Sequence, residues 1–248
     1  MNDKRLQQDL QRLYGSHAAA LSAPPRAAVL ELAGPADWSA LGAVWRGVQS
    51  DLGLPAPAIA VNGHDGFQLW FALAEVGMAA QAAEFLPALC RAYLPELRPT
   101  RLSMWSAAMA TAAPALPPQR QREQQVAGEQ WSAFVAPDLA PVFSDEPWLD
   151  TEPGPEAQAE VLGRLACISP SQLAAALEQL GARAGSMSPP QAPSAQPARP
   201  MAPVGLETNG ADETDPRRFL LRVMNDEAVA MALRIEAAKA LLSAPAKP

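Results

Sequence analysis

The chain has only two cysteines and two histidines among its 248 residues. Cys90 and Cys167 lie far apart, so the sequence offers neither a disulfide framework nor the ligand spacing of a zinc site. Both cysteines lie in apolar patterns of helical type, and we expect two buried thiols in a reducing compartment. The sequence predicts no cofactor and no metal site.

Long apolar runs are also missing. None reaches the roughly 18 residues that a membrane-spanning helix requires. The N-terminal segment MNDKRLQQDLQRLYGSH is polar, helical in pattern, and lacks the apolar stretch of a secretory signal. We therefore expect a cytoplasmic protein without membrane contact.

Positive charge is scarce. The formal net charge is −7, and residues 1–150 carry ten basic and fifteen acidic side chains. This balance argues against nucleic-acid binding that depends on the overall charge of the protein. Residues 215–248 carry six basic and four acidic side chains, so this segment alone is mildly positive.

Apolar residues make up 49% of the chain, enough for a sizeable core. Their spacing predicts an α+β fold, with a small mixed or antiparallel sheet and packed helices. The expected order is a strand at 26–33, a helix after Asp37, a hairpin at 58–73, a helix at 78–94 and a strand at 97–105.

The rest of the chain has a different character. Residues 112–130 are predicted to form an irregular connection. The aromatic segment 131–149 is expected to close the core of the preceding α+β module. Two helices follow, the second with Ser169 as N-cap, Pro170 at N1 and Gln172 at N3. The predicted regions are an N-terminal helix (1–25), an α+β domain (26–150), a helical extension (151–184), a disordered Pro-rich linker (185–214) and a C-terminal helical hairpin (215–248).

The polar turn of the predicted hairpin is the main candidate for a functional site. Asn and Asp tolerate left-handed backbone and Gly adopts it freely, so turn chemistry alone explains this composition. The functional interpretation is a nucleotide or phosphate site formed by backbone N–H groups and polar side chains. The candidate nucleotide-binding residues are Glu31, Asn62, Gly63, Asp65, Gly66 and Gln68.

The segment Asn62-Gly63-His64-Asp65-Gly66-Phe67-Gln68 resembles the second motif of the archaeo-eukaryotic primase, or primase–polymerase, superfamily. In that family two acids on one strand, a small-Gly-x-Gly-x-His turn and a third acid form a two-metal nucleotidyl-transfer site. Glu31 would correspond to the first acid. The resemblance covers at most residues 26–110 and implies a module related to DNA replication.

The sequence departs from this family pattern at the catalytic positions. Ala33 stands at the position of the second acid and Gln68 at that of the histidine. No acid occupies the third-motif strand around Met104. Two-metal catalysis needs clustered carboxylates, so the resemblance implies a module that has lost polymerase chemistry and retains a surface for phosphate or base.

The C-terminal segment DPRRFLLRVMNDEAVAMALRIEAAKALL resembles a helical segment of phage small-terminase-type proteins. The resemblance implies assembly or DNA association in a mobile genetic element, with a protein partner bound through residues 215–242. The basic residues of this segment are otherwise explained as the polar faces of amphipathic helices. Candidate nucleic-acid contacts are Arg98, Arg101, Arg217 and Arg218.

Three hypotheses of function follow. The first is a non-catalytic primase-like accessory protein of a bacterial mobile element, which binds nucleic acid or nucleotide weakly and recruits a partner. The second is an active nucleotidyltransferase with acids supplied by Asp37, Asp65 or Asp138. The third is an assembly protein without nucleic-acid contact. Base stacking on Trp70 or Phe67 is a minor alternative to core packing.

Overall fold

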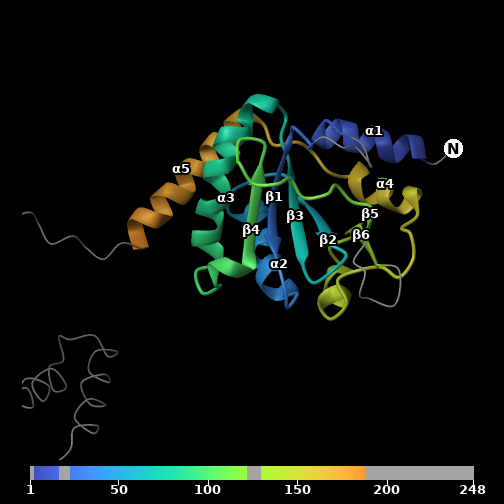
Figure 1. The fold of residues 1–248 in the computed structure, drawn as a ribbon. Helices are drawn as coiled ribbons and strands as arrows, with labels where there is room; N and C mark the ends of the chain where they lie inside the picture. Colours follow the sequence, from blue (N-terminus) through green and yellow to red (C-terminus); the bar gives the residue numbers. More distant parts are fainter. Residues whose placement is uncertain (1–2, 17–22, 122–129, 188–248) are drawn as a thin grey trace, which may run out of the picture. The chain divides into compact units, whose positions relative to one another are not determined.

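The computed structural model describes residues 3–16, 23–121 and 130–187 (Figure 1). These residues form an α+β fold around one six-stranded antiparallel sheet, which confirms the predicted fold class. The sheet has the order β4-β1-β3-β2-β6-β5. The strands are β1 (Ala27–Leu32), β2 (Ala58–Val61), β3 (Phe67–Ala72), β4 (Leu102–Ser106), β5 (Gln119–Gln121) and β6 (Gln130–Val135).

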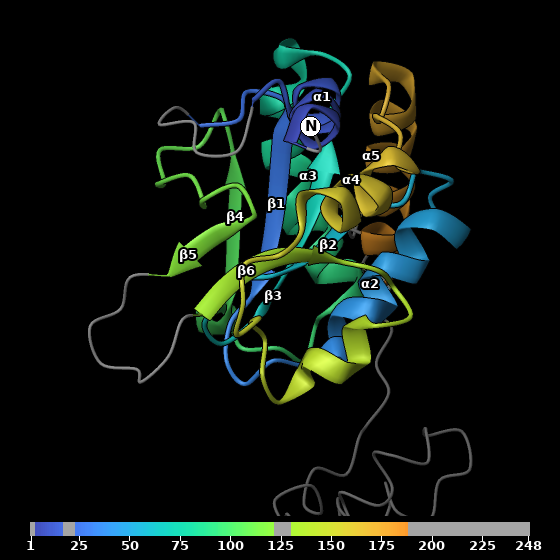
Figure 2. The same ribbon diagram turned by 90° about the vertical axis from the view of Figure 1, so that its right-hand side faces the viewer.

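Helices cover both faces of the sheet (Figure 2). One face packs against α1 (Asp3–Tyr14) and α4 (Pro155–Gly163). The other packs against α2 (Trp38–Ser50), α3 (Ala79–Tyr93) and α5 (Pro170–Met187). Three short 3₁₀ helices complete the described part: η1 (Val76–Met78), η2 (Pro99–Arg101) and η3 (Ala140–Ser144).

The alternation of side chains along each strand creates two separate cores. Leu30 of β1 and Phe71 of β3 belong to the core under α2, α3 and α5. Val29 and Trp70, one position along, belong to the core under α1 and α4. Because both faces are covered, β1 and β3 are apolar almost throughout, and the few polar residues on them stand out.

The ends of two helices follow the predicted capping chemistry. The Asp37 carboxylate accepts a hydrogen bond from the Ser39 hydroxyl at 2.7 Å and one from the Ala40 N–H at 3.1 Å. These two bonds lower the pKa of the Asp37 carboxyl. At the start of α5, the Gln172 N–H donates to the Ser169 hydroxyl and the Ser169 N–H donates to Gln172 Oε1. This reciprocal pair is the predicted capping box.

Three local predictions were wrong. The strand expected at 97–105 begins only at Leu102, because Pro99 starts a 3₁₀ turn. The segment expected to be irregular contains β5, which pairs with β6. Cys90 is buried, and burial raises the pKa of its thiol to about 11, but Cys167 is only partly buried and lies between α4 and α5 rather than within a helix.

The helices at 3–14, 155–163 and 170–187 belong to the same compact unit as the sheet. Helix α5 passes the expected linker start at residue 185 and reaches Met187. The remaining linker and the C-terminal helical hairpin lie outside the described residues and stay predictions. Within the described ranges, no helix has the length and hydrophobicity to cross a bilayer.

Tyr14, the last residue of α1, is fully buried against Trp70 and Phe134, at ring-centroid distances of 5.6 and 6.2 Å. Burial raises the pKa of its hydroxyl, and the hydroxyl has no hydrogen-bond partner among the described residues. Tyr14→Phe should therefore raise the free energy of unfolding by about 1 kcal/mol, since it removes a buried polar group without a partner.

Urea unfolding of the full chain measures this change. The matched control is Tyr93→Phe, which removes a half-exposed hydroxyl bonded to Asp51 and Arg183 and should lower or leave unchanged the free energy of unfolding. A Tyr14→Phe variant less stable than the parent would show that its hydroxyl is paired.

Candidate functional site

The candidate site lies where β1 and β3 face each other near the end of the hairpin. Glu31 and Gln68 are register partners on these adjacent strands, so both side chains project from the face that carries Val29 and Trp70. Gln68 Nε2 donates to Glu31 Oε2 at 2.8 Å, and Gln68 Oε1 accepts from Trp70 Nε1 at 2.8 Å. The two candidate residues Glu31 and Gln68 therefore lie side by side on one face of the sheet.

Asn62 organises the turn between β2 and β3. Its Oδ1 accepts the backbone N–H groups of His64, Asp65 and Gly66 at 2.9 to 3.0 Å. Its Nδ2 donates to Glu31 Oε1 at 3.0 Å and to Asp65 Oδ1 at 3.1 Å. The N–H groups considered as phosphate donors therefore already bind Asn62, so their role in this structure is to hold the turn.

Gly63 and Gly66 have structural reasons to be glycine. Gly63 has φ +81°, the left-handed region that side chains disfavour. A Cβ at Gly66 would lie 2.2 Å from the carbonyl oxygen of Leu32, because the start of β3 passes close to the end of β1. Asp65 joins the same two segments, as its Oδ2 accepts the Gly34 N–H at 3.2 Å.

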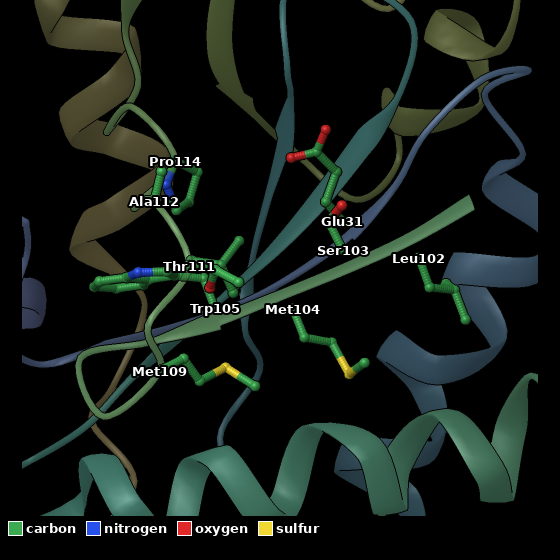
Figure 3. A pocket seen from close by; sticks show the side chains of 10 residues that line it. Glu31, Leu102, Ser103, Met104, Trp105, Met109, Thr111, Ala112 and Pro114 are labelled. Carbon is green, nitrogen blue, oxygen red and sulfur yellow. The ribbon is translucent and has the colours of Figure 1, made fainter. Parts of the chain in front are cut away.

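A recess of about 500 Å³ opens beside Glu31 (Figure 3). Its lining comes from β1, from β4 and from residues 109–114 of the following segment. Ser103 of β4 and its register partner Glu31 of β1 project from one face of the sheet. Leu102 and Met104 of β4 project from the other face, toward α3. Apart from Glu31, Ser103 and Thr111, the lining side chains are apolar.

Glu31 is the chemically distinctive group of this recess. It is half-buried, and within the described ranges no lysine or arginine forms an ion pair with it. Each carboxylate oxygen accepts one hydrogen bond, from Asn62 or from Gln68, and an ionised oxygen has the capacity for a second. The site is therefore suited to a ligand that donates hydrogen bonds, such as the N–H edge of a base.

The two arginines predicted to contact nucleic acid differ in their environments. Arg101 Nε donates to the Ala33 carbonyl at 3.2 Å and Nη2 donates to that of Pro35, so this guanidinium holds the turn after β1. Arg98 is exposed at the start of η2. Arg217 and Arg218 lie outside the described residues.

Of the three alternative acids of a nucleotidyltransferase, Asp65 lies near Glu31, since both accept from Asn62, whereas Asp37 and Asp138 lie elsewhere. Asp37 caps α2, and Asp65 is bonded to the turn. Asp138 lines a different cavity, of about 560 Å³, together with Trp45 and Arg164. In the part of the chain that the structure describes, no group of three His, Cys, Asp or Glu side chains is placed to hold a metal ion.

Some site features were not predicted from the sequence. Ser103 and the apolar segment 109–114 carry no motif, and only the packing of that segment beside β4 brings them to Glu31. Trp70 and Phe67, the candidates for base stacking, are fully buried in the two cores and present no face to a ligand.

Comparison of the chain with protein-family models, with curated proteins and with solved structures found no match. The primase-like and terminase-like resemblances thus depend on the short motifs alone, and the function is argued from the geometry of the site.

The arrangement around Asn62 predicts a pH-dependent effect of Asn62→Asp. The variant keeps an oxygen for the three N–H groups but places a carboxylate against those of Glu31 and Asp65. We expect it to lower the free energy of unfolding at pH 7 by about 2 kcal/mol, through like-charge repulsion. Repulsion raises the folded-state pKa of this cluster above its unfolded value, so the loss should grow as pH rises through that pKa and shrink in acid.

Thermal or urea unfolding between pH 4 and 8 measures the effect. His64→Asp is the control, because it introduces a carboxylate at an exposed position of the same turn. A loss of stability for Asn62→Asp that is equal at all pH values would contradict the deduced contact with the two carboxylates.

Proposed function

We propose that this chain is a non-catalytic, primase-like accessory protein of a bacterial mobile element. It binds single-stranded nucleic acid or a nucleotide weakly, through an exposed base that enters the recess beside Glu31. A protein partner is recruited through residues 215–242.

The position of Glu31 supports this proposal most directly. A carboxylate held between two side-chain amides, at the wall of a mostly apolar recess, is a preorganised acceptor for N–H groups. Guanine offers an amino group beside its N1–H, so both carboxylate oxygens find a donor. Apolar lining residues such as Trp105 and Pro114 provide contact for the ring.

Recognition through the base rather than the phosphate is consistent with the charges. The chain is acidic overall, the turn N–H groups are bound by Asn62, and Arg101 is bonded to backbone carbonyls. Arg98 is exposed in the segment that leads into β4, a strand that lines the recess, and we propose it for a phosphate contact. Binding with few ionic contacts is weak and depends little on salt.

A segment that recruits a partner would compensate for weak affinity. When two contacts are joined by a flexible tether, the second becomes intramolecular and gains an effective concentration in the millimolar range. In this proposal the Pro-rich segment that follows α5, up to residue 214, is the tether and residues 215–242 supply the second contact.

Titration of the full chain with guanosine, inosine and thymidine monophosphates tests the base contact, with tryptophan fluorescence or NMR shifts as the readout. Inosine lacks the amino group of guanosine and should bind about tenfold more weakly, the value of one good hydrogen-bonding contact. Glu31→Gln should reduce the affinity for guanosine monophosphate by about tenfold or more, since its amide presents donors to the base.

Glu96→Gln is the matched control, because Glu96 is exposed in the segment between α3 and η2 and should leave binding unchanged. Equal affinity for the three nucleotides, or an unchanged Glu31→Gln variant, would contradict the proposal. Flat titrations, repeated with a guanine-containing single-stranded oligonucleotide, would favour an assembly protein without nucleic-acid contact.

A further inference from the structure

The two edges of the sheet differ in how well they are protected. At one edge, β5 has only three residues and carries the exposed Arg120, and short charged edge strands resist pairing with other chains. At the other edge, β4 has five residues, LSMWS, with neither a charge nor a proline. Among the described residues no strand pairs with its outer side.

The ladder between β1 and β4 determines which main-chain groups face outward. The Ala33 N–H donates to the Arg101 carbonyl at 2.9 Å, so these two residues form a hydrogen-bonded pair. In an antiparallel ladder such pairs alternate, and Ser103 and Trp105 therefore also bond toward β1. The N–H and C=O groups of Leu102, Met104 and Ser106 point to the free edge.

Two of these six outward groups are already bonded within the chain. The Leu102 N–H donates to the Pro99 carbonyl, and the Ser106 carbonyl accepts the Met109 N–H at 2.9 Å. Among the described residues, the outward groups left without a main-chain partner are the Leu102 carbonyl, both groups of Met104 and the Ser106 N–H. This set is symmetric about Met104.

We propose that β4 pairs in antiparallel fashion with β4 of a second copy of this chain, with a two-fold axis at Met104. The N–H and C=O of Met104 then bond to those of its counterpart. The Ser106 N–H of each copy donates to the Leu102 carbonyl of the other. The four open groups of each strand are all satisfied, as a closed two-fold interface requires.

An unrelated extended peptide fits this edge less well. At the position opposite Leu102, such a peptide would present a carbonyl to the Leu102 N–H, which already donates to Pro99. At the position opposite Ser106, it would present an N–H to the Ser106 carbonyl, which already accepts from Met109. A second copy has those same groups bonded internally and leaves none unpaired. In this register Ser103 also faces Trp105, a small side chain beside a large one, and no like charges meet on the strands.

The resulting dimer has one continuous sheet with six strands from each copy, and among the described strands the short β5 lies at each outer edge. The two-fold axis is perpendicular to the sheet, so Glu31 projects from the same face in both copies. This inference goes beyond the proposed function and does not depend on it, because dimerisation is measured without nucleic acid.

Sedimentation velocity of the full chain tests the pairing, with a dimer as the expected result. Met104→Pro should convert it to a monomer, because proline removes the outward N–H at the axis but no bond to β1. Met104→Leu, which keeps the main-chain groups, should remain a dimer. Circular dichroism compares the fold of each variant with that of the parent.

Disulfide cross-linking locates the interface even if the Met104→Pro variant fails to fold. In a background with Cys90→Ser and Cys167→Ser, Met104→Cys should form an intermolecular disulfide, since paired Cα atoms lie about 5.5 Å apart. Cys90 must be replaced because its Sγ lies 3.9 Å from Met104 Sδ. Val76→Cys, exposed on η1, is the control that should not cross-link.

A monomeric parent at micromolar concentration would overturn the proposal. So would a folded Met104→Pro variant that remains dimeric, or a Met104→Cys variant that cross-links no faster than Val76→Cys.

Discussion

The side-chain amide of Asn62 is the interaction on which the candidate site depends. One end of this amide accepts three backbone N–H groups of its own turn, and the other donates to two carboxylates. Its orientation is fixed, because the end that accepts cannot donate. The turn geometry and the position of Glu31 are consequently set by the same group.

Gln68 continues this network into an apolar region. Between its bonds to Glu31 and to Trp70, both ends of its amide are paired, which is the condition for burying a polar side chain. Trp70 in turn packs against Tyr14 and Phe134, in the core under α1 and α4. A chain of bonded groups thus leads from the partly exposed carboxylate to the centre of the protein and makes the recess wall rigid.

Most polar groups near the site form hydrogen bonds that stabilise the fold. Asp65 and Arg101 bond to the turn that follows β1, and Asn62 bonds to the turn that precedes β3. Of the carboxylates and amides in this described network, Glu31 combines partial exposure, spare acceptor capacity and a cavity beside it. A site of this kind can bind and orient a ligand, and its function is decided by what enters the recess.

Local patterns were sufficient for several elements. The alternation of apolar residues around a Gly-rich turn predicted the hairpin, and the Asp37 and Ser169 signals located two helix starts within a residue or two. They failed for β5, because a strand of three polar residues has no pattern of its own and forms by pairing with β6. The recess was unpredictable for a similar reason, since residues 109–114 contribute only their position.

The sequence by itself determined the fold class, the hairpin and the set of polar residues near its turn, because these follow from side-chain periodicity and turn chemistry. Tertiary structure alone decided that the turn N–H groups are occupied by Asn62, that Arg101 is held by carbonyls, and that the β4 edge is open. Those outcomes depend on contacts between segments that are distant along the chain, and the spacing of residues in a sequence carries no record of which donor reaches which acceptor.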